Sequence, residues 1–194
     1  MILAAFFILG FGLCAAENIK LEETNPNTTY KNALKAVQME ENLHLLWLSK
    51  GLMLTECVVS KFLNKTDHGA QRTIEMNFKV NQSSTESSRY QQAKGNMTIT
   101  VHRAPHFSYL DVRNDGGDVP QLLTGHKDLL NATKKCVVLE ARIQQYRKVF
   151  CVVFGPRNSG KKCLKYAKDN CASGDEVDLS QCDVPPIKAM KPQA

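Results

Sequence analysis

The stretch RTIEMNFKV, residues 72–80, is the clearest strand of the sequence and decides how the rest is interpreted. Ile74, Met76, Phe78 and Val80 alternate in it with polar residues. Because successive side chains of a strand point to opposite faces, this alternation predicts a strand with one buried face and one solvated face.

Segments with a similar strand-like pattern of apolar residues lie on both sides of this strand, at short spacing and with turn signals between them. We expect strands over 43–48, 54–63, 88–94, 97–102, 106–112, 135–143 and 147–154, and a weaker strand or turn over 119–130. A helix is expected from Thr28 or Thr29 to about residue 40, and a second helix over 161–171. About eight short strands flanked by two helices indicate an all-β barrel or sandwich.

Two glycine-containing turns are predicted between these strands. The Gly95–Asn96 pair is typical of a hairpin turn and would join the strands 88–94 and 97–102. The run Asn114-Asp-Gly-Gly117 predicts a second turn.

The first residues predict a secreted protein. Residues 1–13, MILAAFFILGFGL, are followed by the small residues Cys14, Ala15 and Ala16, which suit a signal peptide over residues 1–16. The run is shorter than the ~20 apolar residues of a membrane-spanning helix, and no later stretch is long and apolar enough, so we expect no membrane attachment. One barrel domain over 17–184, acting as a monomer, and a basic tail over 185–194 would follow.

Six of the seven cysteines lie after the predicted signal peptide. An even number in an oxidising compartment predicts three disulfides, although six cysteines allow about fifteen pairings. Glycosylation sequons, which would mark surface positions in a glycoprotein, occur at Asn27, Asn64, Asn81, Asn96 and Asn131.

The formal net charge is +6, and basic residues are concentrated between Lys134 and Lys168. A basic face could attract anionic ligands, glycosaminoglycans or cell surfaces. A solvated exterior is the other interpretation, and we predict no nucleic-acid partner.

Three motifs that suggest other chemistry lack essential residues. Gly155–Cys163 resembles a phosphate-binding loop, but Lys162 stands where a hydroxyl must hold Mg²⁺, and the preceding strand belongs to an antiparallel pair. A proline between His102 and His106 breaks the helical spacing of a zinc pair. The stretch Asp169–Ser180 has serine and cysteine where a calcium loop needs carboxylates. We therefore expect no enzyme activity, no metal and no cofactor.

Several short segments, in order and over most of the chain, carry a family resemblance. They are TTYKNALKAV (28–37), LLWL (45–48), Cys57, GHKDLLNATKKCVVL (125–139), CVVF (151–154), CLKYAK (163–168) and Cys182. Together they resemble the tick salivary lipocalins, which include the tick histamine-binding proteins. The resemblance implies an eight-stranded antiparallel lipocalin-like barrel with a short N-terminal helix and a C-terminal helix. It also implies a central cavity for small mediators and the disulfides Cys57–Cys182, Cys136–Cys163 and Cys151–Cys171.

Either face of each strand could point into the barrel, and one of the two arrangements would suit a biogenic amine. Phe107, Tyr109 and Asp111 share one face of their strand, and Glu140 and Arg142 share one face of another. If these faces point inward, the two carboxylates and the aromatic rings could receive an ammonium group, which is costly to bury without such partners. Exposed charges on the barrel exterior are the alternative interpretation.

The other choice of faces gives an apolar interior. It places inside a set made up of Leu110, Val112, Val137, Leu139, Ala141, Ile143, Ile74, Met76, Phe78, Val80, Met97, Ile99 and Val101. This lining favours a fatty acid or leukotriene, whose carboxylate could meet Arg103, Arg142 or Lys79, or else a packed core without a cavity. Trp47 could contact ligand or pack in either case.

The sequence therefore predicts a secreted scavenger of small host mediators of inflammation, either an amine such as histamine or serotonin, or an eicosanoid or fatty acid. Its role would be evasion of host defence. The alternative is a protein-binding inhibitor whose barrel exterior engages a host complement or coagulation protein in plasma.

Overall fold

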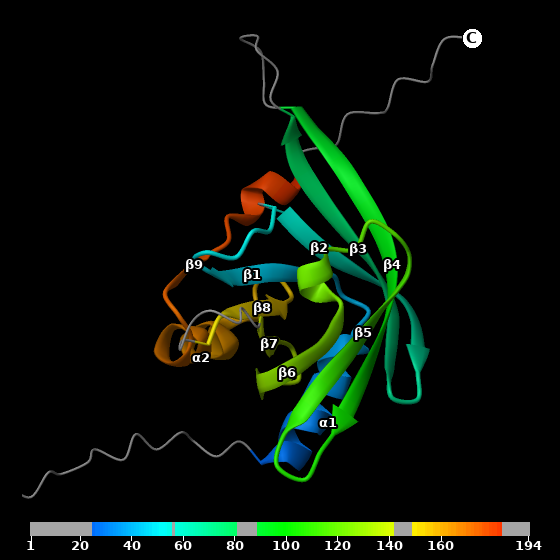
Figure 1. Cartoon of the computed structure of the whole chain (residues 1–194), viewed down its shortest axis with the longest axis vertical. Helices are drawn as coiled ribbons and strands as arrows, with labels where there is room; N and C mark the ends of the chain where they lie inside the picture. Colours follow the sequence, from blue (N-terminus) through cyan, green and yellow to red (C-terminus); the bar gives the residue numbers. More distant parts are fainter. Residues whose placement is uncertain (1–24, 56, 81–88, 142–148, 184–194) are drawn as a thin grey trace, which may run out of the picture.

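The computed structural model describes residues 25–55, 57–80, 89–141 and 149–183. Within them, eight antiparallel strands close into a barrel (Figure 1). The strands are β1 (Leu43–Ser49), β2 (Cys57–Thr66), β3 (Gly69–Val80), β4 (Arg89–Arg103), β5 (Ser108–Gly117), β6 (Gly125–Ala132), β7 (Val137–Glu140) and β8 (Cys151–Gly155). Each pairs with the next, and β1 closes the ring by pairing with both β8 and β2. The expected barrel is confirmed.

Two helices and three short elements complete the described fold. They are α1 (Pro26–Val37), the 3₁₀ turn η1 (Gln121–Leu123), α2 (Lys161–Asn170), β9 (Gly174–Glu176), which pairs with β1, and the 3₁₀ turn η2 (Leu179–Asp183). Helix α1 begins after Asn25, whose side chain accepts a hydrogen bond from the backbone N–H of Asn27 at 2.9 Å. It lies across one end of the barrel, which we call the closed end (Figure 1). We call the opposite end, where the β1–β2 and β5–β6 connections lie, the mouth.

The barrel interior is apolar. Its buried cluster includes ten residues of the apolar alternative derived from the sequence: Ile74, Met76, Met97, Ile99, Val101, Leu110, Val112, Val137, Leu139 and Ala141. Of the two choices of strand faces, the structure therefore has the apolar one. This outcome follows from burial energy, because removing apolar surface from water stabilises the fold by about 25 cal/mol per Å².

A fully buried arginine closes the barrel at the end that carries α1. Arg72 is 0 % exposed and lies on the same inward-facing side of β3 as Ile74. Its guanidinium donates to the backbone carbonyls of Val37 at 3.0 Å, Met39 at 2.6 Å, Glu41 at 2.9 Å and Ser60 at 3.0 Å. Burial lowers the pKa of Arg72 to about 10, so it stays charged at neutral pH. The cation thus satisfies carbonyls at and after the C-terminus of α1, which have no partner inside the helix.

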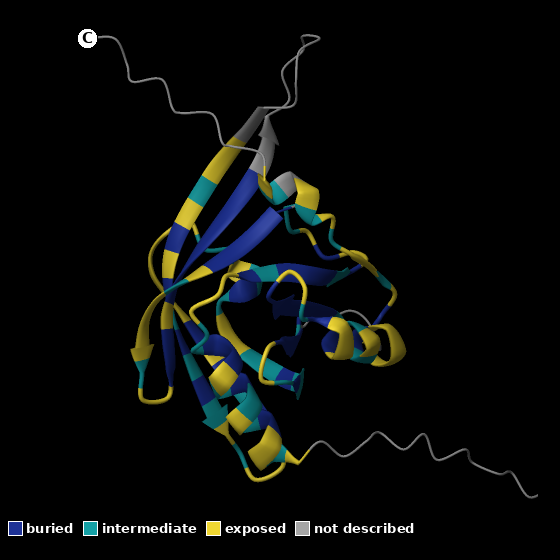
Figure 2. Cartoon of the chain, turned by 180° about the vertical axis from the view of Figure 1, so that it is seen from behind, coloured by how far each residue is buried: buried dark blue, intermediate teal, exposed yellow. Residues whose placement is uncertain are grey.

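A second core lies outside the barrel, under α2. Trp47, Val138 and Val153 from the outer faces of β1, β7 and β8 pack there against Cys163 and Ala167 of the helix. A register shift in β1 between residues 45 and 47 places two successive side chains in this outer core. Figure 2 shows α2 with its inner side buried and its outer side exposed.

The hairpin predicted at Gly95–Asn96 is wrong. Strand β4 runs without interruption through both residues, pairing with β3 on one side and with β5 on the other. Gly95 is needed for close approach rather than for a turn, because a Cβ atom there would lie 2.6 Å from a methyl carbon of Val119. The turn predicted at Asn114–Gly117 is also wrong, since these residues form the last part of β5.

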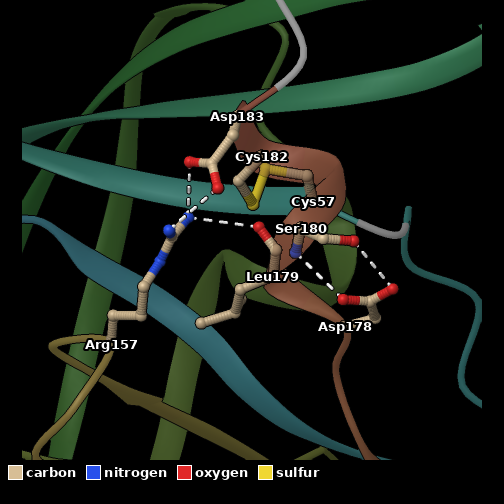
Figure 3. A network of polar contacts seen from close by, with 7 residues as sticks. All are labelled: Cys57, Arg157, Asp178, Leu179, Ser180, Cys182 and Asp183. Carbon is tan, nitrogen blue, oxygen red and sulfur yellow. Dashed lines mark hydrogen bonds and ion pairs between the residues drawn. A yellow bond between two sulfur atoms is a disulfide. The ribbon is translucent and has the colours of Figure 1, made fainter.

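The six described cysteines form three disulfides, Cys57–Cys182, Cys136–Cys163 and Cys151–Cys171. These are the pairs that the family resemblance implies. Figure 3 shows how the first of them, together with an ion pair, holds η2 against the barrel. Arg157 donates to the Asp183 carboxylate at 2.8 and 3.0 Å and to the carbonyl of Leu179 at 3.1 Å.

Acid is expected to destabilise the protein through His44, which lies beside this ion pair. Burial, and secondarily the charge of Arg157, lowers the pKa of His44 below its ordinary 6.5. The unfolded chain therefore takes up the proton first, and stability decreases as the pH falls below about 6.5. We expect the urea midpoint to fall from pH 7 to pH 5, and His44→Gln to reduce this fall. His68→Gln, at an exposed position, is the control, and an equal effect of both variants would contradict the assignment.

Candidate ligand-binding site

An open cleft of about 710 Å³ lies at the mouth of the barrel. Three parts of the chain that are far apart in sequence form its walls: the β1–β2 connection, the mouth ends of β3 and β4, and the β5–β6 connection. The lining residues are Met53, Leu54, Thr55, Met76, Gln91, Gln92, Ala93, Asp118, Val119 and Pro120. Its volume falls in the ~300–1,000 Å³ range of small-molecule pockets.

The cleft has an apolar floor and a polar rim. Met76 belongs to the interior cluster, and Leu54, Ala93 and Val119 pack against that cluster. Thr55, Gln91, Gln92 and Asp118 supply hydroxyl, amide and carboxyl groups. A ligand with an apolar body and a small polar group therefore matches the described lining.

Below this floor the barrel interior is nearly filled. A cavity of about 40 Å³ remains, lined by eleven apolar residues and Ser60. That space is sufficient for a few water molecules and is far below the volume of a drug-sized ligand. No carboxylate lines it among the described residues. Of these two spaces, only the cleft at the mouth is large enough for such a ligand.

Three residues expected to suit an amine lie on the outer face of the barrel. Phe107 is 48 % exposed, and Asp111 is also exposed. Tyr109 stacks between the imidazole rings of His102 and His126, with ring centroids 4.8 and 4.3 Å apart. The hypothesis that this face of β5 points into the barrel is therefore wrong. Leu110 and Val112 occupy the inner face, and the side chains of a strand alternate between its two faces.

Glu140 and Trp47, two further predicted ligand residues, do not line the cleft. Glu140 is half-buried, next to the inward-facing Leu139 and on the opposite face of β7. Trp47 packs under α2 outside the barrel. The side chain of Phe78 and the whole of Arg142 lie outside the described residues. Arg103, considered as a carboxylate partner near the mouth, instead donates to the Asn27 side chain at the closed end.

Sequence reasoning missed most of the cleft, including Met53, Thr55, Gln92 and Asp118. These residues lie in connections or at strand ends, where no periodic pattern marks a face. One signal was present: the weak strand or turn predicted over 119–130 begins with Val119 and Pro120, which line the cleft.

The predicted glycosylation sites fall in different environments. Asn27, Asn64 and Asn96 are exposed, Asn131 is half-buried in β6, and Asn81 lies outside the described residues. The predicted signal peptide and basic tail also lie outside them.

No group of histidine, cysteine and acidic side chains that could hold a metal ion occurs in the described part of the chain. Neither α1, with 12 residues, nor α2, with 10, could span a bilayer.

Comparison with known proteins supports the architecture. No family model and no curated protein matches the chain. Among solved structures, the chain is similar to Japanin from Rhipicephalus appendiculatus bound to cholesterol, a tick salivary lipocalin. The two are 13 % identical, the match covers 75 % of this chain and 97 % of Japanin, and the TM-score is 0.52. At this identity the likeness concerns the fold alone. The closed eight-stranded barrel and this neighbour together show that the chain has the lipocalin fold.

Proposed function

We propose that this protein is a secreted lipocalin of the tick salivary type that binds a small apolar ligand, such as a fatty acid or leukotriene, in the mouth cleft. The observation that carries the proposal is the cleft itself, about 710 Å³ in volume, with an apolar floor that continues the barrel core. The ligand of Japanin, cholesterol, is apolar too.

An apolar ligand suits the described lining better than a biogenic amine. Burying an ammonium group without a carboxylate or an aromatic face is costly. The two carboxylates expected to serve an amine, Asp111 and Glu140, belong to neither the cleft lining nor the interior lining. Asp118, at the cleft rim, is exposed. An amine there would stay largely in water, where an ion pair is worth little.

The biological role follows from the ligand class and the compartment. The predicted signal peptide and the three disulfides fit an oxidising, extracellular setting. A secreted protein that holds a lipid mediator lowers its free concentration. We infer sequestration of a host mediator of inflammation as the function, in keeping with the resemblance to tick salivary lipocalins.

Ala93→Trp is expected to weaken lipid binding at least tenfold, about 1.4 kcal/mol or more. The indole would fill space at the apolar floor, where Ala93 lines the cleft. Gln71→Trp is the matched control, because Gln71 is an exposed residue of β3 that does not line the cleft. We expect the control to bind within twofold of the wild type. Equal affinities of both variants would contradict the site.

The measurement is displacement of a visible-wavelength fluorescent fatty acid by arachidonate, a leukotriene, cholesterol, histamine and serotonin. Intrinsic tryptophan fluorescence is a poor reporter, since the single tryptophan of the chain, Trp47, packs outside the barrel. Displacement by the lipids and not by the amines is the expected result. Displacement by the amines alone would overturn the ligand class.

One observation favours the second candidate, a protein-binding inhibitor. The interior cavity is only about 40 Å³, as in a barrel that serves as a scaffold. In that case folded protein binds neither lipids nor amines, and Ala93→Trp leaves inhibition of complement or coagulation assays unchanged.

A further inference from the structure

The outer side of α2 and the neighbouring β6–β7 connection carry a cluster of lysines that the proposed ligand site does not involve. We call it the basic face and define it as Lys134, Lys135, Lys161, Lys162 and Lys165. All five side chains are exposed. A sixth lysine of the helix, Lys168, is paired with Glu176 at 2.6 Å and is left out of the set.

A disulfide holds the two parts of the basic face together. Cys136 and Cys163 are bonded, with Cα atoms 6.3 Å apart. Lys135 directly precedes the first cysteine and Lys162 directly precedes the second. The β6–β7 connection therefore cannot move away from the start of the helix, and its two lysines stay beside those of α2.

The helix geometry directs its lysines outward. Cys163 and Ala167 are buried in the outer core, so the opposite side of α2 faces solvent (Figure 2). Lys161 and Lys165 are four residues apart and lie on one side of the helix, with Lys162 three residues before Lys165. Lys165 is thus about one helical turn, ~5 Å along the axis, from both Lys161 and Lys162 in this ten-residue helix.

The basic face lacks compensating acids. None of its five lysines forms an ion pair with another described residue. The nearby carboxylates in sequence are Glu140, on the outer face of β7, Asp169, in the last turn of α2, Asp175, which pairs with Lys50, and Glu176, which pairs with Lys168. Unpaired like charges held side by side repel one another, and a polyanion relieves that repulsion by taking the place of small counterions.

We propose that the basic face binds a linear sulfated polysaccharide of the heparan sulfate type. A row of lysines on a fixed surface fits an extended chain of anionic groups, and each contact releases counterions from that chain, as for other linear polyanions. An anionic membrane fits less well. Surface helices that bind bilayers place large apolar residues in the lipid, whereas Leu164 and Tyr166 of α2 pack against the outer core. Binding would hold the protein on tissue surfaces, beside the cells that release mediators.

The test uses the full secreted protein on immobilised heparin. We expect Lys161→Gln/Lys162→Gln/Lys165→Gln to weaken binding at least tenfold at ~0.15 M salt, since each lysine near an anionic surface adds several-fold to affinity. The slope of log affinity against log salt should fall by roughly one or less for each lysine removed. The double variant Lys134→Gln/Lys135→Gln should lose affinity as well.

A charge-matched control separates the basic face from net charge. Lys31→Gln/Lys35→Gln/Lys65→Gln removes three exposed lysines of α1 and β2, elements that both views place apart from α2 (Figures 1 and 2). We expect this control to bind heparin within twofold of the wild type. An equal loss in both triple variants would overturn the proposal, as would absence of heparin binding at ~0.15 M salt. Stronger retention by phosphatidylserine vesicles than by heparin would assign the face to membranes and overturn it too. Lipid binding in the mouth cleft should be the same in all variants.

Discussion

Replacing Arg72 by methionine is expected to lower the free energy of unfolding by about 3 kcal/mol, the largest effect of any single substitution predicted for this protein. Methionine keeps much of the apolar stem of the side chain but removes every donor. The carbonyls of Val37, Met39, Glu41 and Ser60 then lose their hydrogen bonds at the closed end of the barrel. Each buried unsatisfied polar group costs about 1–3 kcal/mol, and relief from burying the cation offsets part of the sum.

The measurement is urea unfolding of the wild type and the variant, followed by circular dichroism. A second readout is limited proteolysis after α1, because Arg72 is bonded to the residues at the end of this helix. Arg113→Met is the matched control, since Arg113 is exposed and forms an ion pair with Asp115, two residues away. We expect the control to lose less than about 1 kcal/mol. A loss below about 1 kcal/mol in Arg72→Met would refute the role given to the buried cation.

Removing the Cys57–Cys182 disulfide is expected to destabilise the protein more than removing either of the others. This bond joins residues 125 apart, compared with 27 and 20 for the other two. In the chain-entropy model the longer loop corresponds to about 5 kcal/mol and the shorter loops to about 3.5 kcal/mol each. Without the bond, η2 keeps the Arg157–Asp183 ion pair, which is exposed and too weak to hold the segment in place.

Three double variants test this order: Cys57→Ala/Cys182→Ala, Cys136→Ala/Cys163→Ala and Cys151→Ala/Cys171→Ala. Alanine avoids placing a hydroxyl where Cys57 is 2 % exposed. Each variant is unfolded in urea under oxidising conditions, and the free energies of unfolding are compared. A smaller loss for the first variant than for the third would show that strain or residual structure, and not loop length, sets the contribution of these bonds.

The sequence predicted most of the strands because apolar and polar residues alternate along them. Residues 72–80 alternate in this way and β3 spans them, but the solvated face predicted for this strand is wrong at Thr73, Glu75 and Asn77, which are buried. The prediction failed where glycine has two uses. Gly95 looks like half of a hairpin turn, yet in β4 it makes room for Val119, which approaches from a connection more than twenty residues later. Nothing local distinguishes these two uses of a glycine.

The candidate site was the least predictable part. The sequence suggested an amine site at Phe107, Tyr109 and Asp111 because these residues share one face of a strand. Alternation alone, however, does not determine whether that face points into or out of the barrel. The apolar residues between them decided the direction, since they gain more from burial. The cleft, in contrast, combines Leu54, Gln92 and Val119, which meet only when the barrel closes.

The sequence by itself determined the β class, the two flanking helices and which apolar residues share a face, because these depend on local periodicity and propensity. Closure of the barrel decided the rest. Closure forms the cleft at the mouth. It also buries Arg72 at the opposite end, where its guanidinium binds backbone carbonyls, and it brings the lysines of α2 next to those of the β6–β7 connection. These features depend on contacts between residues far apart in the chain, and such contacts leave no pattern in any short stretch of sequence.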